Sequence, residues 1–318
     1  MKTVNIIALL ATLLFVVGCK NEKQNTNSDE KLPKSITLGS YFQAVDYAPF
    51  LIAKEKGWFE AALKEKSIKI NYEHFEDLAN MNDAFLKNDL DVVFEAAPPA
   101  IVSESAKVGI DIVNISCSLT QEILVRKETD INSIADLKGK KIAVLSGTSS
   151  HYGVLKLLND NNISESDLSI IDMAPVDAKI AFESDQIDAW AVWPPFVEQQ
   201  EISGKGRVLP KGDVYIHSIM AVDEDFMKSY PIVFKKIDSV FNESKIWIIN
   251  HEVEAIDIMA EVLNIDRAVI DRAWAKHDWS VILNKKILDD IQNKADFLVE
   301  RKKINKKVDV AADLIELK

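Results

Sequence analysis

The chain has 318 residues, of which 47% are hydrophobic, a length and composition that favour two domains with ordinary apolar cores. Its 50 acidic residues outnumber its 38 basic residues and give a formal net charge of −12 at pH 7. This balance argues against a nucleic-acid-binding protein, which needs a basic surface. Only two cysteines are present, Cys19 and Cys117, too few for a disulfide framework or a cysteine-rich metal site.

The first residues follow the pattern of a secretory signal. Lys2 gives a positive start, residues 6–17 are almost wholly apolar, and a glycine and Cys19 end the run. An apolar run of this length is short for a transmembrane helix, and a cysteine behind small residues suits a lipoprotein cleavage site. We therefore expect residues 1–18 to be a bacterial lipoprotein signal peptide and Cys19 to carry the lipid. A plain N-terminal membrane anchor is the alternative.

Strands and helices alternate beyond a polar segment, residues 19–34, whose composition predicts a disordered tether. The apolar patterns predict strands at 35–39, 68–74, 91–94 and 110–115, with helices at 50–56 and 78–87 between them. This alternation predicts a mostly parallel sheet with right-handed crossovers.

The same order returns in the second part of the chain. We expect strands at 141–145, 169–172 and 189–192, and helices at 152–159 and 176–184. Residues 90–99 and 187–195 are similar to each other, and each pairs a strand with a Pro-Pro turn. Ligands of open parallel sheets bind at the carboxyl ends of the strands, so two such lobes facing each other would enclose a ligand. Residues 214–222 look extended, and the chain after Pro231 is almost wholly helical.

One turn stands out in the second part, between the strand that ends at Leu145 and the helix that follows. It contains Gly147 and three small hydroxyl residues, the types that cap a helix and expose its first N–H groups. Those groups have no partner within the helix, and the helix dipole adds partial positive charge, so the turn suits an anion. An ordinary capped helix is the alternative.

Several segments together identify the family. They are residues 46–49 (DYAP), 53–59 (AKEKGWF), 91–98 (DVVFEAAP), 136–144 (DLKGKKIAV), 147–151 (GTSSH) and 187–196 (IDAWAVWPPF). With them the chain from Ser35 onward resembles a solute-binding protein of an ABC importer, in the family that binds aliphatic sulfonates, taurine, nitrate and thiamine-type pyrimidines. The resemblance implies the two-lobed type II periplasmic-binding-protein fold, an α/β fold that closes around a small ligand by hinge motion.

Each lobe of that fold is expected to be a mostly parallel sheet flanked by helices, with a helical C-terminal region. The first lobe would comprise residues 35–121 and 216–318, and the second lobe residues 122–215. The resemblance also implies that residues 147–151 cradle the oxyanion of a sulfonate or a like group. Within that turn we assign Gly147, Thr148, Ser149 and Ser150 to the oxyanion, whereas His151 either contacts the ligand or packs at the helix start.

Five further residues are candidates for the ligand site. Gln43, Asp46 and Tyr47 lie in the loop after the first strand, where Asp46 either pairs with an amine or caps the following helix. Glu95 stands where the family usually has a small residue. It would repel an anionic solute unless an ammonium or a hydrogen-bonding heterocycle answers it, or it turns to solvent. Trp193 is expected to form a wall of the cleft.

These patterns predict a lipid-anchored, extracytoplasmic and monomeric component of an ABC importer that captures an alkanesulfonate or taurine. Its partners would be the small-molecule solute, the permease subunits, and the membrane through the lipid, without nucleic acid, cofactor or metal. A thiamine-type pyrimidine or nitrate is the alternative solute, and a sensory receptor module the alternative role. An enzyme on the same fold is disfavoured because the sequence has no Gly-x-Ser-x-Gly elbow and no metal-type His or Cys spacing, so we assign no catalytic residue.

Overall fold

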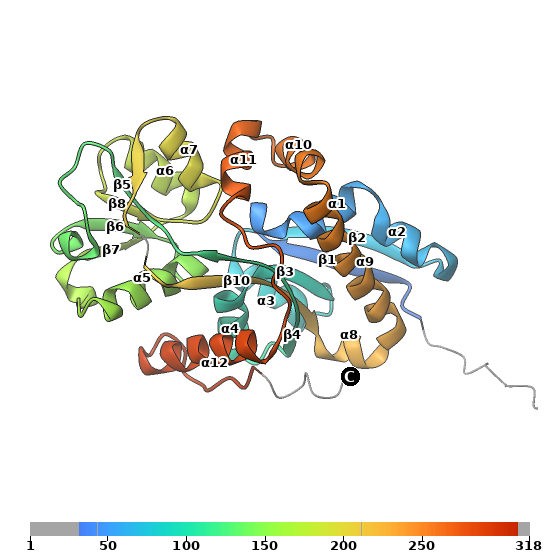
Figure 1. The fold of residues 1–318 in the computed structure, drawn as a ribbon. Helices are drawn as coiled ribbons and strands as arrows, with labels where there is room; N and C mark the ends of the chain where they lie inside the picture. Colours follow the sequence, from blue (N-terminus) through green and yellow to red (C-terminus); the bar gives the residue numbers. More distant parts are fainter. Residues whose placement is uncertain (1–31, 43, 211, 311–318) are drawn as a thin grey trace, which may run out of the picture. The chain divides into compact units, whose positions relative to one another are not determined.

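The computed structural model describes residues 32–42, 44–210 and 212–310, which form an α/β fold with two sheets flanked by helices (Figure 1). The α/β class predicted from the sequence is confirmed. The expected signal peptide, Cys19, most of the expected tether and Gln43 lie outside the described residues. Within the described ranges, no helix is both long and apolar enough to cross a membrane.

The first sheet has five strands in the order β2-β1-β3-β10-β4. They are β1 (Ser35–Tyr41), β2 (Lys69–Phe75), β3 (Val92–Ala96), β4 (Ile110–Thr120) and β10 (Tyr215–Asp223). β1 is parallel to β2 and β3, as predicted, but β10 is antiparallel to both β3 and β4. The chain leaves this sheet along β4 and returns along β10, so the two strands run in opposite directions. The sheet is therefore mixed rather than mostly parallel.

The second sheet repeats this design in the order β7-β6-β8-β5-β9. Its strands are β5 (Ile123–Arg126), β6 (Lys141–Val144), β7 (Ser169–Asp172), β8 (Ala189–Ala191) and β9 (Gly206–Val208). β6 is parallel to β7 and β8, whereas β5 is antiparallel to β8 and β9. β3 and β8, the strands of the repeated segment, thus hold equivalent places in the two sheets.

The Pro-Pro pairs that follow β3 and β8 differ. Pro98 and Pro99 lie in the first turn of a helix, where no backbone N–H is needed. Pro194 and Pro195 are joined by a cis peptide bond and precede a helix. The prediction of a Pro-Pro turn is therefore correct after β8 and wrong after β3.

Twelve α-helices flank the two sheets in the described part of the chain. The first four are α1 (Ala48–Glu55), α2 (Trp58–Leu63), α3 (Leu78–Leu86) and α4 (Ala97–Ser105), and the next three are α5 (Ser149–Asp160), α6 (Pro175–Glu183) and α7 (Phe196–Ile202). The helical C-terminal region comprises α8 (Glu224–Ser229), α9 (Pro231–Asn250), α10 (Glu252–Leu263), α11 (Arg267–Trp274) and α12 (Lys285–Glu300). Short 3₁₀ helices cover Val45–Tyr47 (η1), Lys64–Lys66, Ile134–Leu137 and Glu165–Asp167.

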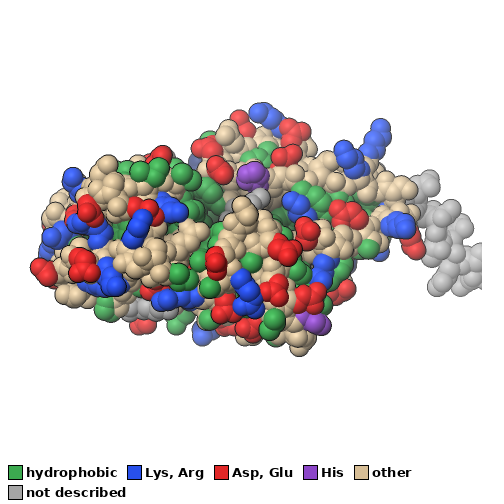
Figure 2. All heavy atoms as spheres, turned by 90° about the horizontal axis from the view of Figure 1, so that it is seen from above, with side chains coloured by type: hydrophobic (Ala, Val, Ile, Leu, Met, Phe, Trp, Pro, Cys, Tyr) green, Lys and Arg blue, Asp and Glu red, His purple; other side chains and the backbone are tan. Residues whose placement is uncertain are grey.

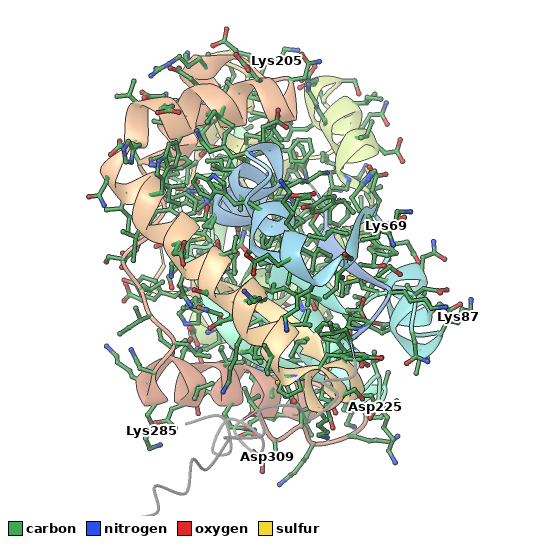
Figure 3. All side chains as sticks on the ribbon, turned by 90° about the vertical axis from the view of Figure 1, so that its right-hand side faces the viewer. Lys69, Lys87, Lys205, Asp225, Lys285 and Asp309 are labelled. Atoms are coloured by element: carbon green, nitrogen blue, oxygen red, sulfur yellow. The ribbon has the colours of Figure 1, made fainter. Side chains whose placement is uncertain are left out.

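The C-terminal helices pack mainly beside the first sheet. α9 lies along α1 and α2, and α12 lies against α4. Charged side chains such as Lys69, Lys87 and Lys285 stand at the periphery (Figure 3). Acidic and basic side chains are interspersed over the face displayed in Figure 2. We conclude that these charged helix faces are mostly solvated.

Aromatic residues fill the cores on both sides. Beside the first sheet, the ring of Phe94 stacks on Phe50, with centroids 4.1 Å apart, and also contacts Phe241. Beside the second sheet, the buried Trp190 packs against Phe182, so Trp190 belongs to the core.

The two crossings between the sheets lie side by side. In the first crossing, between β4 and β5, the N–H of Gln121 donates to the carbonyl of Val214 in the second crossing, at 2.8 Å. The side chain of Gln121 also rests on α5 at Gly153, where a Cβ atom would come within 2.3 Å of the Gln121 Cγ atom. Only glycine allows this approach, so α5 packs directly against the first crossing.

Candidate functional site

The turn between β6 and α5 has the capped geometry expected from the sequence. Thr148 is the N-cap residue: its Oγ1 accepts from the N–H of His151 at 3.4 Å and donates to the carbonyl of Leu145 at 2.7 Å. Gly147 has a φ of +80°, a left-handed conformation that favours glycine. The Nδ1 atom of His151 accepts from the N–H of Gly147 at 3.3 Å. Thr148 and His151 therefore use these polar atoms to shape the turn.

Three donors at the start of α5 remain unpaired. Within the described residues, the backbone N–H groups of Ser149 and Ser150 make no hydrogen bond. The hydroxyl of Ser150 is fully buried and also has no partner in the described part of the chain. Because α5 continues to Asp160, its dipole adds partial positive charge here. The helix start can therefore accept an anion.

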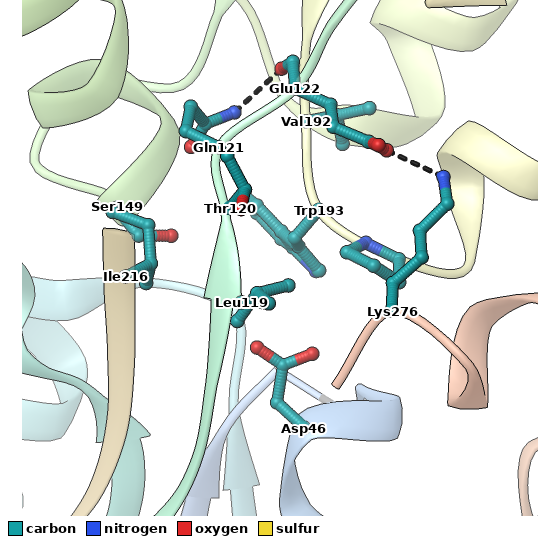
Figure 4. Close-up of a pocket in the computed structure, with 11 residues that line it drawn as sticks. Asp46, Leu119, Thr120, Gln121, Glu122, Ser149, Val192, Trp193, Ile216 and Lys276 are labelled. Atoms are coloured by element: carbon teal, nitrogen blue, oxygen red, sulfur yellow. Dashed lines mark hydrogen bonds and ion pairs between the residues drawn. The ribbon is translucent and has the colours of Figure 1, made fainter. Parts of the chain in front are cut away.

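Two adjoining pockets meet at this helix start, and both contact Asp46, Ser149 and Trp193. Pocket A is also lined by Leu119, Thr120, Gln121, Glu122, Val192, Pro194, Ile216 and Lys276 (Figure 4). Pocket B is also lined by Tyr41, Phe42, Tyr47, Ala96, Pro99 and Thr148. In each pocket, residues of the first sheet meet residues of α5 and of the loop after β8. Each has a cavity volume of about 20 Å³, room for about one water molecule.

The structure brings together five of the candidates predicted from the sequence. Asp46, Tyr47, Thr148, Ser149 and Trp193 line the two pockets. The other described candidates stand behind or beside the lining, and these are Glu95, Gly147, Ser150 and His151. Gln43 cannot be placed because it lies outside the described residues.

Asp46 is held in a hydrogen-bonded network. Its side chain is 5% exposed; Oδ2 accepts from the hydroxyl of Ser218 at 2.9 Å, and Oδ1 lies 3.0 Å from Nε2 of His277. The other ring nitrogen, Nδ1, lies 2.8 Å from the carbonyl of Ala273. Both ring nitrogens of His277 therefore face oxygen atoms of the protein. Asp46 caps neither η1 nor α1 with its side chain, so the helix-capping alternative is wrong.

The thiol of Cys117 lies beside this network. Together Asp46, Cys117 and His277 place three potential metal-ligand atoms within 4.8 Å of one another. The Cys117 thiol donates to the carbonyl of Asp46 at 3.6 Å, and burial, with the nearby Asp46 charge, raises the pKa of that thiol well above its usual value. The three side chains thus hydrogen-bond within the protein, and the thiol keeps its proton.

Glu95 is buried without a partner. Its side chain is 0% exposed, and neither carboxyl oxygen makes a hydrogen bond within the described ranges. Burial raises the pKa of this carboxyl well above its usual value, because the buried site disfavours the charged form. The alternative that Glu95 turns to solvent is wrong.

Trp193 stands where the two pockets meet. Its ring is half-buried and contacts Phe42 from the first sheet, with centroids 4.9 Å apart, and Phe196 from α7. Phe42 and Trp193 thereby join the two sides of the molecule next to pocket B. This position agrees with the expected wall of the cleft.

The sequence analysis missed a charged cluster that borders pocket A. The Nζ atom of Lys276, just after α11, lies 2.5 Å from Glu122 in the first crossing and 2.6 Å from Glu198 in α7 (Figure 4 shows the contact with Glu122). Burial lowers the pKa of Lys276, but the charges of Glu198 and Glu122 outweigh it and raise that pKa overall. Because 154 residues separate Lys276 from Glu122, no local pattern could have indicated this contact.

Comparison with known proteins identifies the family of this chain. The model of the NMT1/THI5-like family matches residues 44–255. A Bacillus subtilis (strain 168) protein named for aliphatic sulfonate binding is 31% identical over 316 residues, covering 96% of this chain and 92% of that protein. A protein of Escherichia coli (strain K12) named for the same binding is 24% identical and covers 88% of each chain.

Solved structures share the fold. The alkanesulfonate-binding protein SsuA from Xanthomonas axonopodis pv. citri, bound to MOPS, has a TM-score of 0.79 at 21% identity, covering 88% of this chain and 98% of that one. The desulfurization enzyme DszB matches with a TM-score of 0.66 at 15% identity, covering 86% of this chain and 95% of that one. Both likenesses concern the fold alone. The extent of the family match and the 31% identity to the Bacillus protein show that the chain belongs to the NMT1/THI5-like family, as the sequence motifs predicted.

Proposed function

We propose that this protein is the extracytoplasmic solute-binding component of an ABC importer and that it captures a small sulfonate, an alkanesulfonate or taurine. The names of the Bacillus and Escherichia relatives support this class of solute. The single observation that carries the proposal is the start of α5, where the N–H groups of Ser149 and Ser150 and the Ser150 hydroxyl find no partner among the described residues and lie beside the pockets.

The hydrogen bonds that these three donors can make are strong enough to contribute much of the binding free energy of a sulfonate. A hydrogen bond to a charged group contributes roughly 1.5–3 kcal/mol. Three such bonds would provide more than half of the about −8 kcal/mol that micromolar affinity requires, before the costs of binding are counted. Aliphatic contacts on Trp193 and Phe42 would add apolar burial for the stem of an alkanesulfonate.

Binding would follow from a hinge motion between two lobes, residues 35–121 with 216–318 and residues 122–215. The hydrogen-bonded crossings at Gln121 and Val214 are the natural place for the bend. The pockets have room for about one water molecule each, so a sulfonate needs the lobes to part before it enters. Lys276 would help to hold the closed form because it joins the segment after α11 to Glu122 and Glu198.

The same proposal includes the N-terminal segment. Cys19, behind the expected signal peptide 1–18, would carry the lipid, and residues 19–34 would tether the body to the outside of a bacterial membrane. The permease subunits would then receive the solute from the closed protein. We propose binding rather than catalysis because the charged side chains that line the pockets are already engaged: Asp46 with His277, and Glu122 with Lys276.

A ligand screen with one matched pair of variants tests the proposal. Ligand binding to the native state raises thermal stability by mass action, so ethanesulfonate or taurine should raise Tm, whereas nitrate and thiamine-type pyrimidines should not. Ser150→Ala removes one donor and should weaken sulfonate binding by about tenfold. Ser146→Ala removes an exposed hydroxyl from the same turn and should leave binding unchanged. A Tm shift with the pyrimidine alone, or equal binding by both variants, would contradict the proposal.

A further inference from the structure

We propose that Glu95 is a specificity-determining residue, which favours sulfonates that carry an ammonium group and releases a proton to solvent when such a solute binds. This inference rests on the proposed function above. It states that one buried side chain determines which sulfonates the protein binds more tightly.

The first observation is the missing partner. Asp46, Glu122 and Glu198 are also buried carboxyl groups near the pockets, and each has a nitrogen partner within 3.0 Å, His277 for Asp46 and Lys276 for the other two. Glu95 is 0% exposed and has no partner in the described part of the chain. A buried polar group without a hydrogen bond costs about 1–3 kcal/mol, so its presence calls for a reason other than stability.

The second observation is the position of Glu95 in the first sheet. In the β1–β3 pair, Ser40 is opposite Phe94, so the next residues, Tyr41 and Glu95, are neighbours on the other face of the sheet. The ring of Phe94 packs on Phe50, away from that face. Tyr41 lines pocket B, and so does Ala96, which follows Glu95 in the chain. Glu95 therefore lies directly behind the first-sheet side of pocket B.

The electrostatic surroundings of Glu95 agree with this position. Burial raises the pKa of Tyr41 and of Tyr47, and the charge of an ionised Glu95 would raise both further. The titratable groups that face Glu95 are thus Tyr41 from β1 and Tyr47 from η1, both of them neutral at neutral pH. Among the described residues no cation acts on its carboxyl. We infer that a positive charge for this group comes from the bound solute.

Pocket B lies between the two sites that an aminosulfonate would contact, one for its sulfonate group and one for its ammonium group. On one side it contacts Thr148 and Ser149 at the start of α5, and on the other Tyr41, Tyr47 and Ala96 around Glu95. A sulfonate at the unpaired N–H groups would direct its stem from α5 toward the first sheet. An ammonium on that stem would meet a carboxyl without a counterion, whereas an uncharged stem would leave the carboxyl buried and neutral.

The proton balance follows from these two states. Before binding, Glu95 is the carboxylic acid. When an ammonium enters, the O–H bond of Glu95 breaks, the proton passes to solvent buffer, and a carboxylate–ammonium pair forms. The ammonium keeps all three of its protons. Binding of an aminosulfonate should therefore release close to one proton, and binding of an alkanesulfonate should release none.

The experiment compares taurine with ethanesulfonate, which lacks the ammonium group, by calorimetry with the wild-type protein and with Glu95→Gln. Titrations at neutral pH in phosphate and in Tris, whose ionisation enthalpies differ, give the number of protons released. We expect the wild type to bind taurine about tenfold more tightly than ethanesulfonate and to release a proton only with taurine. Glu95→Gln should lose both the preference and the proton release and should still bind ethanesulfonate.

Two controls keep the outcomes separate. Glu73→Gln changes an exposed carboxylate on β2 and should behave as the wild type, and Glu95→Leu covers the case in which the glutamine variant folds poorly. If the wild type binds both sulfonates equally, or if Glu95→Gln keeps the preference for taurine, the assignment of Glu95 is wrong while the proposed function stands. If the wild type binds neither sulfonate, the proposed function fails and this inference fails with it.

Discussion

The two sides of pocket B stabilise their polar groups in different ways. At the start of α5, donors stay unpaired because helix geometry itself leaves the first N–H groups without partners. On the first-sheet side, Asp46 is hydrogen-bonded to Ser218 and lies 3.0 Å from His277, whereas Glu95 has no partner in the described part of the chain and burial raises its pKa. The comparison shows that a fold can expose unpaired backbone donors at little cost, but that a buried carboxyl needs either a partner or a proton.

The largest effect should come from breaking the Asp46 network. Asp46→Ala leaves the buried His277 ring and the Ser218 hydroxyl without their acceptor, and each buried donor left unsatisfied costs about 1–3 kcal/mol, or about 2–6 kcal/mol for the two. We expect the free energy of unfolding, measured by urea denaturation, to fall by about this amount. Asp46→Asn, which keeps one acceptor oxygen, should lose less. Equal stability of Asp46→Ala and the wild type would show that the network contributes nothing.

The second test addresses the α5 side. Ser149→Pro removes one of the unpaired N–H groups, and proline is tolerated at the first position of a helix. We expect sulfonate binding to fall below detection in calorimetry while the circular dichroism spectrum and the melting temperature stay close to those of the wild type. Ser149→Ala retains the N–H group and is the matched control. Unchanged binding by the proline variant would remove the N–H of Ser149 from the oxyanion site.

The third test uses the pH dependence of stability to examine the protonation of Glu95. The pKa of Glu95 is raised in the folded protein by burial, so the folded state binds a proton that the unfolded state has lost above about pH 4.3. Stability contributed by this group should therefore fall as pH rises from about 4.3 toward the folded pKa, by up to about 1.4 kcal/mol per pH unit. In Glu95→Gln, denaturation at several pH values should lack this slope. A slope identical to that of the wild type would mean that Glu95 is ionised when folded.

The smallest effect is optical. Trp193 touches both pockets, so solute binding should change tryptophan emission. Trp193→Phe should abolish most of that change while leaving the sulfonate affinity within about threefold, because the phenyl ring keeps much of the apolar contact. A full emission response in the variant would place the solute away from Trp193.

Local features of the fold could be predicted from the sequence because they depend on neighbouring residues. The strand, the turn at Gly147, the Thr148 cap and the start of α5 all follow from short-range rules. The alternation of strands and helices also gave the parallel pairs of β1 and β6. The extended segment that forms β10 was predicted, but its antiparallel direction and the strand β5 were not, because they follow from the two crossings between the sheets and not from any local pattern.

The partners of the site residues could not be predicted, since they come from distant parts of the chain. Asp46 and His277 are 231 residues apart, and Asp46 and Ser218 are 172 apart. A single sequence gives the type of each residue without its burial. The sequence therefore left Glu95 open between ligand contact and solvent, and the structure shows a third state, buried and unpartnered.

The close fit of Gly153 on Gln121 links α5, the helix that we propose binds the anion, to the crossing where we propose the hinge. Any larger residue at position 153 would force the Gln121 side chain or α5 to shift, so we expect α5 and this crossing to move together in the proposed bend. The outer end of α5, near Asp160, should accordingly swing with the bend while staying far from the solute. A fluorescent dye attached there would make the protein an optical sensor, because its signal would report the change in conformation without contact between the dye and the solute.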